Sequence, residues 1–129
     1  MLGISVDYHG PIFQGDAGQK VVKAISDSIH DLMIEGEKKI DANLYAGHGL
    51  KTGHYRRSVH GEMTSTLHGR IHDSKVVYGP WLEGVGSRNQ RSRFKGYWSF
   101  RQAYQHLEKI KDDVVRKWIN RLVGDLNGR

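Results

Sequence analysis

The sequence contains no cysteine, and this absence excludes several kinds of small protein at once. Without thiols the chain forms no disulfide bond, and a zinc site built on thiolates is impossible. Long apolar runs are missing as well, since the longest fall far short of the ~20 residues needed to cross a bilayer. Residues 1–20 also lack the basic start and apolar stretch of a signal peptide. We therefore expect a soluble protein without a membrane partner, made and kept in the cytoplasm.

The length of 129 residues fits a single domain, so we assign residues 1–129 to one unit without internal repeats. Lys and Arg number 20 against 14 Asp and Glu, which gives a formal charge of +6. This balance favours acidic partners, including nucleic acid, but says nothing about the fold. Most of the 16 glycines lie in the middle of the chain, which is therefore predicted to be rich in turns.

Two long stretches carry apolar residues three and four positions apart, the pattern of an amphipathic helix. The first covers residues 17–43, with Asp16 as its expected N-cap. The second covers residues 99–126, where Ser99 is expected to cap the start. Within the N-terminal segment at residues 1–16, a loose alternation over residues 2–8 indicates a short strand.

Between the two helices the apolar period changes from that of a helix to two. Residues 58–73 are predicted as a β-hairpin with one buried face, and residues 76–78 as a third short strand that Gly79-Pro80 ends. Neither helix can bury its apolar stripe alone. We therefore predict an α+β fold in which a small antiparallel sheet, the hairpin plus the third strand, packs against the two helices.

The segment at residues 84–98 is predicted to be a mobile basic loop, because it is rich in cations and poor in apolar residues. Its candidate contacts with DNA or a partner protein are Arg88, Arg91, Arg93 and Lys95. Together with Arg56, Arg57 and Arg70 they could follow a phosphate backbone. Nearby Tyr97, Trp98 and Phe100 offer stacking surfaces, although we favour a role for them in starting the core face of the last helix.

Candidate catalytic and metal-ligating residues do not form a known arrangement. His60, His68 and His72 project from one side of the predicted hairpin, but the Cα atoms of the last two would lie about 13 Å apart along one strand, too far for one zinc ion. The acids Glu62, Asp73 and Glu83 show no catalytic spacing with these histidines, and the sequence has no phosphate-binding loop. We expect no enzymatic activity, no cofactor and no metal site.

Two short motifs carry a resemblance to a known family. The run Thr52-Gly53-His54-Tyr55-Arg56-Arg57-Ser58-Val59 has the form T-G-x-aromatic-R-x-S-apolar. About twenty residues later, Tyr78-Gly79-Pro80-Trp81-Leu82-Glu83-Gly84-Val85-Gly86 has the form Y-x-x-apolar-apolar-E-x-x-G. In this order, between two long helices, the motifs resemble the tail-component family of siphophages, whose members are neck and tail-completion proteins.

The resemblance implies a structural virion protein rather than an enzyme. It implies a homo-oligomeric ring, hexameric by similarity to tail symmetry, that joins the capsid connector to the tail and lets DNA pass. Its implied partners are a head-closure or connector ring and the tail terminator or tail tube, with non-specific contact to genomic DNA. The implied location is the virion neck, assembled in the host cytoplasm. The motif and interface residues carried over are Thr52, Gly53, Tyr55, Arg56, Ser58, Tyr78, Trp81, Glu83 and Gly84.

The residues themselves suggest further contacts and leave other functions open. Tyr78 and Trp81 are expected to cover the end of the sheet, and Glu83 to pair with Arg56 or Arg57. The first alternative function is a free nucleic-acid-binding module that works through the arginine-rich loop. The second is a small hydrolase that depends on Glu83 or His60, which we regard as the weakest of the three.

Overall fold

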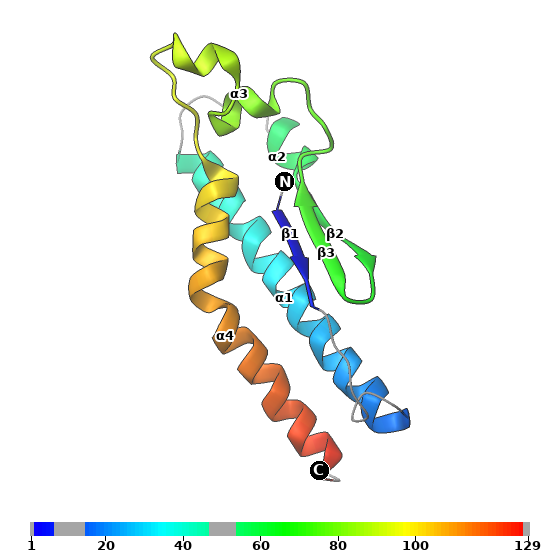
Figure 1. Cartoon of the computed structure of the whole chain (residues 1–129). Coiled ribbons are helices and arrows are strands. Elements are labelled where there is room, and N and C mark those ends of the chain that lie inside the picture. Colours follow the sequence, from blue (N-terminus) through cyan, green and yellow to red (C-terminus); the bar gives the residue numbers. More distant parts are fainter. Residues whose placement is uncertain (1, 7–14, 47–53, 128–129) are drawn as a thin grey trace.

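A computed structural model gives the structure of the chain and describes residues 2–6, 15–46 and 54–127. The elements follow one another as β1 (Leu2–Ser5), α1 (Gly15–Ala46), α2 (His54–Ser58), β2 (His60–Ser65), β3 (His68–His72), α3 (Gly79–Glu83), the 3-10 helix η2 (Ser87–Gln90) and α4 (Ser99–Leu126). A three-stranded antiparallel sheet packs against long helices, which confirms the predicted α+β class (Figure 1).

The helix α1 occupies the centre of the molecule, because it contacts both the sheet and α4 (Figure 1). It extends beyond the predicted residues 17–43 at both ends, so Asp16 lies in its first turn instead of at the N-cap. The carboxylate still suits that position, since the N-terminal end of a helix carries partial positive charge. The predicted apolar stripe is confirmed, with Ile29, Met33, Ile40 and Leu44 all buried.

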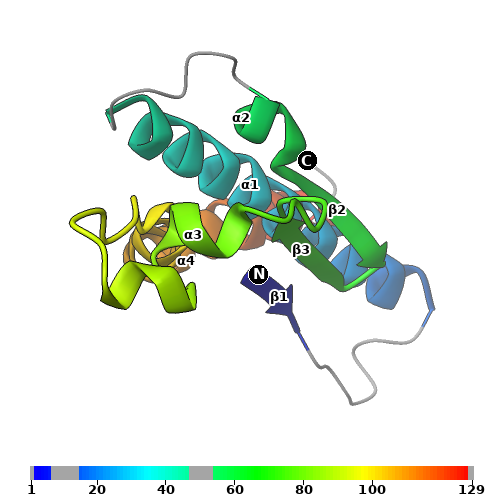
Figure 2. The same cartoon turned by 90° about the horizontal axis from the view of Figure 1, so that it is seen from above.

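The sheet has the order β1-β3-β2, and Figure 2 shows β1 and β2 on either side of β3. The predicted hairpin is confirmed as β2 and β3. Because side chains alternate between the two faces of a strand, Gly69 and Ile71 of β3 face α1. A Cβ added at Gly69 would lie only 2.6 Å from Met33 Sδ. Small residues on this face therefore let the helix approach the sheet closely.

The third strand is β1 and not the predicted segment at residues 76–78, which forms a turn. Two features explain the difference. Ser74 and Lys75 adopt φ angles of 60° and 58°, which ends β3 and turns the chain away from the sheet. Pro80 then lies in the first turn of α3, where its missing N–H and fixed φ suit a helix start. The strand β1 pairs with this edge of β3 instead, where Leu2 pairs with Ile71 and Ile4 pairs with Gly69.

The helix α4 has the predicted bounds and runs antiparallel to α1, side by side with it (Figure 1). In its first half Ala103 and Leu107 are buried against α1. Its second half extends past the sheet and leaves Val115, Ile119 and Val123 between 39% and 50% exposed. This half of α4 therefore carries an apolar stripe that faces solvent in the single chain.

Candidate functional site

The second sequence motif folds into a compact turn around α3. The carbonyl oxygen of Pro80 accepts hydrogen bonds from the backbone N–H groups of Gly84, Val85 and Gly86, at 3.0, 3.0 and 3.1 Å. Gly84 ends the helix with a φ of 97°, a left-handed conformation that glycine adopts without a steric penalty. The glycines of the motif are thus explained by backbone geometry at the end of α3.

Glu83 caps α4 from outside that helix. Its Oε1 accepts the N–H of Phe100 at 2.9 Å, and its Oε2 accepts the N–H of Arg101 at 3.1 Å. The hydroxyl of Ser99 also donates to Glu83, at 3.3 Å, so the prediction that Ser99 caps the helix was wrong. A carboxylate that satisfies two free N–H groups at the positive end of a helix stabilises it. Glu83 is therefore a folding residue that joins the motif to α4.

A close contact between Gly84 and Gly96 closes the segment that joins α3 to α4. Both residues have positive φ angles, and a Cβ at Gly96 would lie 2.3 Å from the backbone of Gly84. Next to this contact, the N–H of Tyr97 donates to the carbonyl oxygen of Leu82 at 2.7 Å. The two ends of the basic segment are thereby held together at the start of α4.

The basic segment was predicted to be a loop without regular structure, but it contains η2 and is organised by Asn89, which is only 3% exposed. The amide of Asn89 donates to the carbonyl oxygens of Trp81 and Phe94 at 3.1 and 3.2 Å, and its Oδ1 accepts the N–H of Gly86 at 2.9 Å. Lys95, predicted to contact DNA or a partner, donates to the carbonyl oxygen of Asn89 at 2.9 Å and so helps to hold the segment together.

The three arginines of this segment, Arg88, Arg91 and Arg93, are all exposed. Their guanidinium groups have no acidic partner among the residues that the structure describes. Arg101 lies at the start of α4, and its guanidinium carbon is 3.7 Å from the centre of the Trp98 ring. The ordered segment therefore presents a cationic surface to solvent, as expected from the sequence.

The aromatic residues around this surface serve mainly the core. Trp81 packs against Phe94 at 5.2 Å between ring centres, and Phe94 packs against Tyr97 at 5.1 Å. Phe100 is part of the shell that covers the buried cluster. The favoured interpretation is confirmed for Tyr97 and Phe100, which pack against the buried cluster, but was wrong for Trp98, which is 37% exposed. Trp81 also packs against this cluster, from α3.

Residues 54–58 of the first motif form the short helix α2. Arg56 pairs with Asp41 of α1 through two hydrogen bonds, one of them 3.1 Å long, and not with Glu83. The predicted link between the motifs through Arg56 is therefore wrong, because Glu83 is engaged by α4. The carbonyl oxygen of Ser58 accepts a hydrogen bond from the Ser74 hydroxyl at 2.8 Å. The predicted sites at Thr52 and Gly53 lie outside the described residues.

The two motifs meet through a pair of tyrosines. The Tyr55 ring is 2% exposed and lies 5.9 Å from the ring of Tyr78, centre to centre. Its hydroxyl donates to Asp73 Oδ2 at 3.2 Å, just after β3. Burial, together with the charge of Asp73, raises the pKa of Tyr55 well above its usual value, so this phenol stays protonated at all physiological pH values. The contact is structural and holds α2 to the segment before α3.

A shallow groove of about 640 Å³ opens where the motifs and α4 meet. It is lined by side chains of Tyr55, Asp73, Glu83 and Arg101, among others. Two apolar residues of its lining project far into solvent: Val77 is 96% exposed and Val85 is 65% exposed. Neither was predicted as an interface residue, since exposure of a single valine leaves no signal in the sequence.

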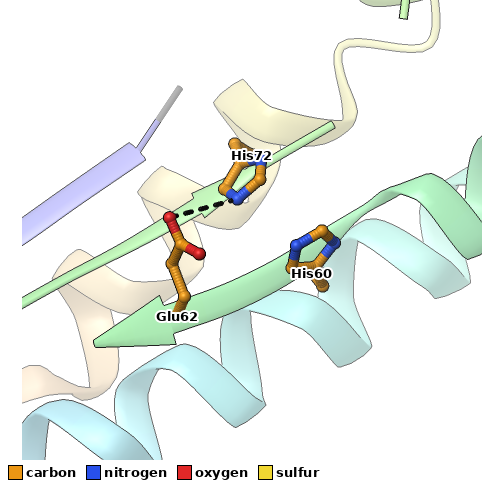
Figure 3. Close-up of side chains that lie close together, drawn as sticks. All are labelled: His60, Glu62 and His72. Atoms are coloured by element: carbon orange, nitrogen blue, oxygen red, sulfur yellow. Dashed lines mark ion pairs between the residues drawn. The ribbon is translucent and has the colours of Figure 1, made fainter. Parts of the chain in front are cut away.

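One group of metal-ligand side chains comes together on the outer face of the hairpin. Figure 3 shows His60 and Glu62 from β2 and His72 from β3 pointing toward one another. His68 does not belong to this group, since its Nδ1 shares a hydrogen bond with the Ser65 hydroxyl instead. The distance argument on His68 and His72 was sound, but the relevant pair is His60 and His72, which face each other across the two strands.

Neither long helix, nor any shorter one in the described part of the chain, has the apolar stretch that a membrane crossing needs. Comparison of the chain with models of known families, with curated proteins and with solved structures gives no match.

Proposed function

We propose that this chain is a non-enzymatic structural subunit of a long-tailed bacteriophage, which forms a ring in the neck between the capsid connector and the tail. The two motifs and their helical frame support the proposal through their resemblance to siphophage tail components. In the described residues, the motif residues Glu83 and Tyr55 are both engaged in folding contacts. A structural role of this kind is what we expect of polar motif residues in an assembly protein.

The observation that carries the proposal is a pair of separate apolar surfaces on one chain. The first, beside the groove, consists of Val77, Tyr78 and Val85, which are 96%, 42% and 65% exposed. The second is the stripe of Val115, Ile119 and Val123 on α4. A closed ring needs two different patches on each subunit that meet across a heterologous interface. In the proposed ring the first surface of one subunit contacts the α4 stripe of the next, and the exposed arginines lie near the DNA path.

The second candidate function, a free nucleic-acid-binding module, is favoured by the exposed Arg88, Arg91 and Arg93. Two measurements on the purified protein distinguish the candidates: its mass in solution at micromolar concentration, and its affinity for duplex DNA over a range of salt concentrations. A ring subunit gives discrete oligomers and at most weak DNA binding. A monomer that binds DNA with a steep salt dependence would support the binding module and contradict the ring, because such a dependence reports release of counterions by several phosphate contacts.

A further inference from the structure

His60, Glu62 and His72 share the outer face of the hairpin, on the side away from α1. His60 and His72 are direct partners across β2 and β3, and their rings lie 4.4 Å apart, centre to centre. Glu62 follows two positions after His60 on the same face, and its Oε1 lies 3.5 Å from His72 Nε2 (Figure 3). The three side chains therefore converge at the open end of the hairpin, opposite its turn.

Two imidazoles and one carboxylate are a donor set that suits a transition metal ion. Candidate ligand atoms of the three residues lie within 4.8 Å of one another. In a tetrahedral zinc site with bonds of about 2.1 Å, the ligand atoms are about 3.4 Å apart. The group must therefore contract by at most about 1.4 Å, since its ligand atoms all lie within 4.8 Å of one another. Rotation of side chains allows this, because His60 is exposed and Glu62 is partly exposed.

The Nε2 atom of His72 gives a second, independent indication. It is buried and has no hydrogen-bond partner among the residues that the structure describes, although the side chain of His72 is 20% exposed as a whole. Buried polar atoms in folded proteins almost always have a partner, and an exception calls for an explanation such as an ion. This atom points toward Glu62, at the centre of the group (Figure 3).

We propose that His60, Glu62 and His72 bind one divalent transition metal ion, for which Zn²⁺ is the best match, on the outer face of the hairpin. Zinc favours nitrogen and carboxylate ligands in this ratio, whereas Mg²⁺ and Ca²⁺ prefer oxygen alone. Three protein ligands leave a fourth position for water or for a ligand from another molecule. The ion ties β2 to β3 at the open end of the hairpin, independently of the assembly role proposed above.

Two existing contacts affect how the ion binds. Arg70 Nε donates to Glu62 Oε1 at 2.6 Å and competes for that carboxylate, although the second oxygen of Glu62 can still ligate. The N–H of Ser74 donates to His72 Nδ1 at 3.0 Å, so the neutral ring carries its proton on Nε2. Metal binding at Nε2 transfers that proton to solvent while Nδ1 takes one up, and the Ser74 contact breaks. Ser74 has a φ of 60°, so the turn that must rearrange is already strained.

The test is titration of the untagged, full-length protein with Zn²⁺ in a calorimeter, combined with thermal melting with and without the ion. We expect one ion per chain and a higher melting temperature in its presence. His60→Ala and Glu62→Gln should each weaken binding at least about tenfold, since loss of even an outer partner of a ligand costs that much. His68→Ala is the matched control, because His68 lies on the same face of β3 outside the group. It should bind as the wild type does.

The His60→Ala variant gives the most informative titration, because His60 is exposed and its replacement leaves the buried core intact. Circular dichroism can verify that this variant is folded. Absence of binding to the wild-type protein would overturn the proposal. Equal affinity of the wild type and His60→Ala would overturn it too, since the ion would then bind to other histidines of the chain. Loss of zinc binding in His68→Ala, with binding retained in the other two variants, would also overturn the proposal.

Discussion

Glu83 is the residue on which the join between the second motif and α4 depends. Its two carboxylate oxygens accept three hydrogen bonds from the first turn of α4, at Ser99, Phe100 and Arg101. The negative charge also lies at the positive end of the helix dipole. An acidic residue at this place in the motif is thus explained by helix capping, without any catalytic role.

Replacement of Glu83 by alanine should lower the free energy of unfolding by about 1–2 kcal/mol, because two helical N–H groups lose their acceptor. Urea denaturation followed by circular dichroism measures this change. Glu108→Ala is the matched control, since Glu108 lies on the exposed side of the same helix, where it pairs with Lys111. An equal loss of stability in the two variants would contradict the capping role.

Gly96 is required by the geometry of the basic segment, where it contacts the backbone of Gly84 at a φ of 93°. Gly96→Ala should destabilise the protein by at least about 2 kcal/mol, because the left-handed conformation and the collision at Cβ add together. Gly124→Ala provides the contrast, since no atom lies within 4 Å of its added Cβ in α4. It should leave stability unchanged or raise it by up to about 1 kcal/mol. A tolerated alanine at residue 96 in a melting experiment would show that this contact is not needed.

At the scale of elements, α1 and α4 are joined by a polar contact far from the sheet. Asp31 of α1 accepts hydrogen bonds from Lys117 Nζ at 2.6 Å and from Trp118 Nε1 at 2.8 Å. Burial raises the pKa of Asp31, but these hydrogen bonds and the charges of Lys117 and Arg121 outweigh it, so the pKa lies below the ordinary value of 3.8. The contact fixes the register of the two helices where the apolar packing between them is sparse.

This lowered pKa predicts a dependence of stability on pH. The contribution of Asp31 is present above its unfolded pKa and is lost as the pH falls through the lower folded value. Asp31→Asn should therefore lower the free energy of unfolding at neutral pH by about 1 kcal/mol. The difference between wild type and variant should shrink as the pH falls through the lowered folded pKa, because the wild-type carboxyl then becomes protonated as well. Urea titrations across this range measure it, and a difference that grows toward acid pH would contradict the assignment.

The helices and the hairpin were predictable because their apolar periods extend over many residues, as in α1 and β3. Residues 2–8 indicated a strand, but its place as the third strand of the sheet was not predictable, because Val76 and Val77 resemble a strand locally while the φ angles of Ser74 and Lys75 direct the chain into a turn. Periodicity also cannot reveal that one buried side chain, Asn89, orders a segment rich in arginine. The pairing of His60 with His72 depends on the register between two strands, which the spacing along one strand does not give.

At the scale of the whole molecule, the described part of the chain has a rigid core and two separate apolar surfaces. The core joins α1, the sheet and the start of α4, and Gly36 lets Ile71 and Leu107 meet there. Val77 lines the groove together with Arg101 and Tyr104 at the start of α4, and the exposed stripe with Ile119 belongs to the other half of this helix. Two separate patches of this kind are what the heterologous contacts of the proposed ring require.

Val77→Asp should leave the fold intact, since this side chain is 96% exposed, and should impair assembly by placing a charge in the proposed interface. The measurement is complementation, in which a plasmid copy of the gene supports a phage that carries a nonsense mutation in it. We expect the Val77→Asp copy to reduce the yield of infectious phage at least about tenfold, since a charge buried in each subunit contact weakens every interface of the ring. Thr66→Asp at the exposed tip of the hairpin should restore full yield. Full yield with both variants would exclude Val77 from the interface.

Electron microscopy of lysates from the nonsense mutant alone tests directly whether this chain joins capsid to tail. We expect DNA-filled heads lying beside separate, finished tails. Normal virions would contradict it.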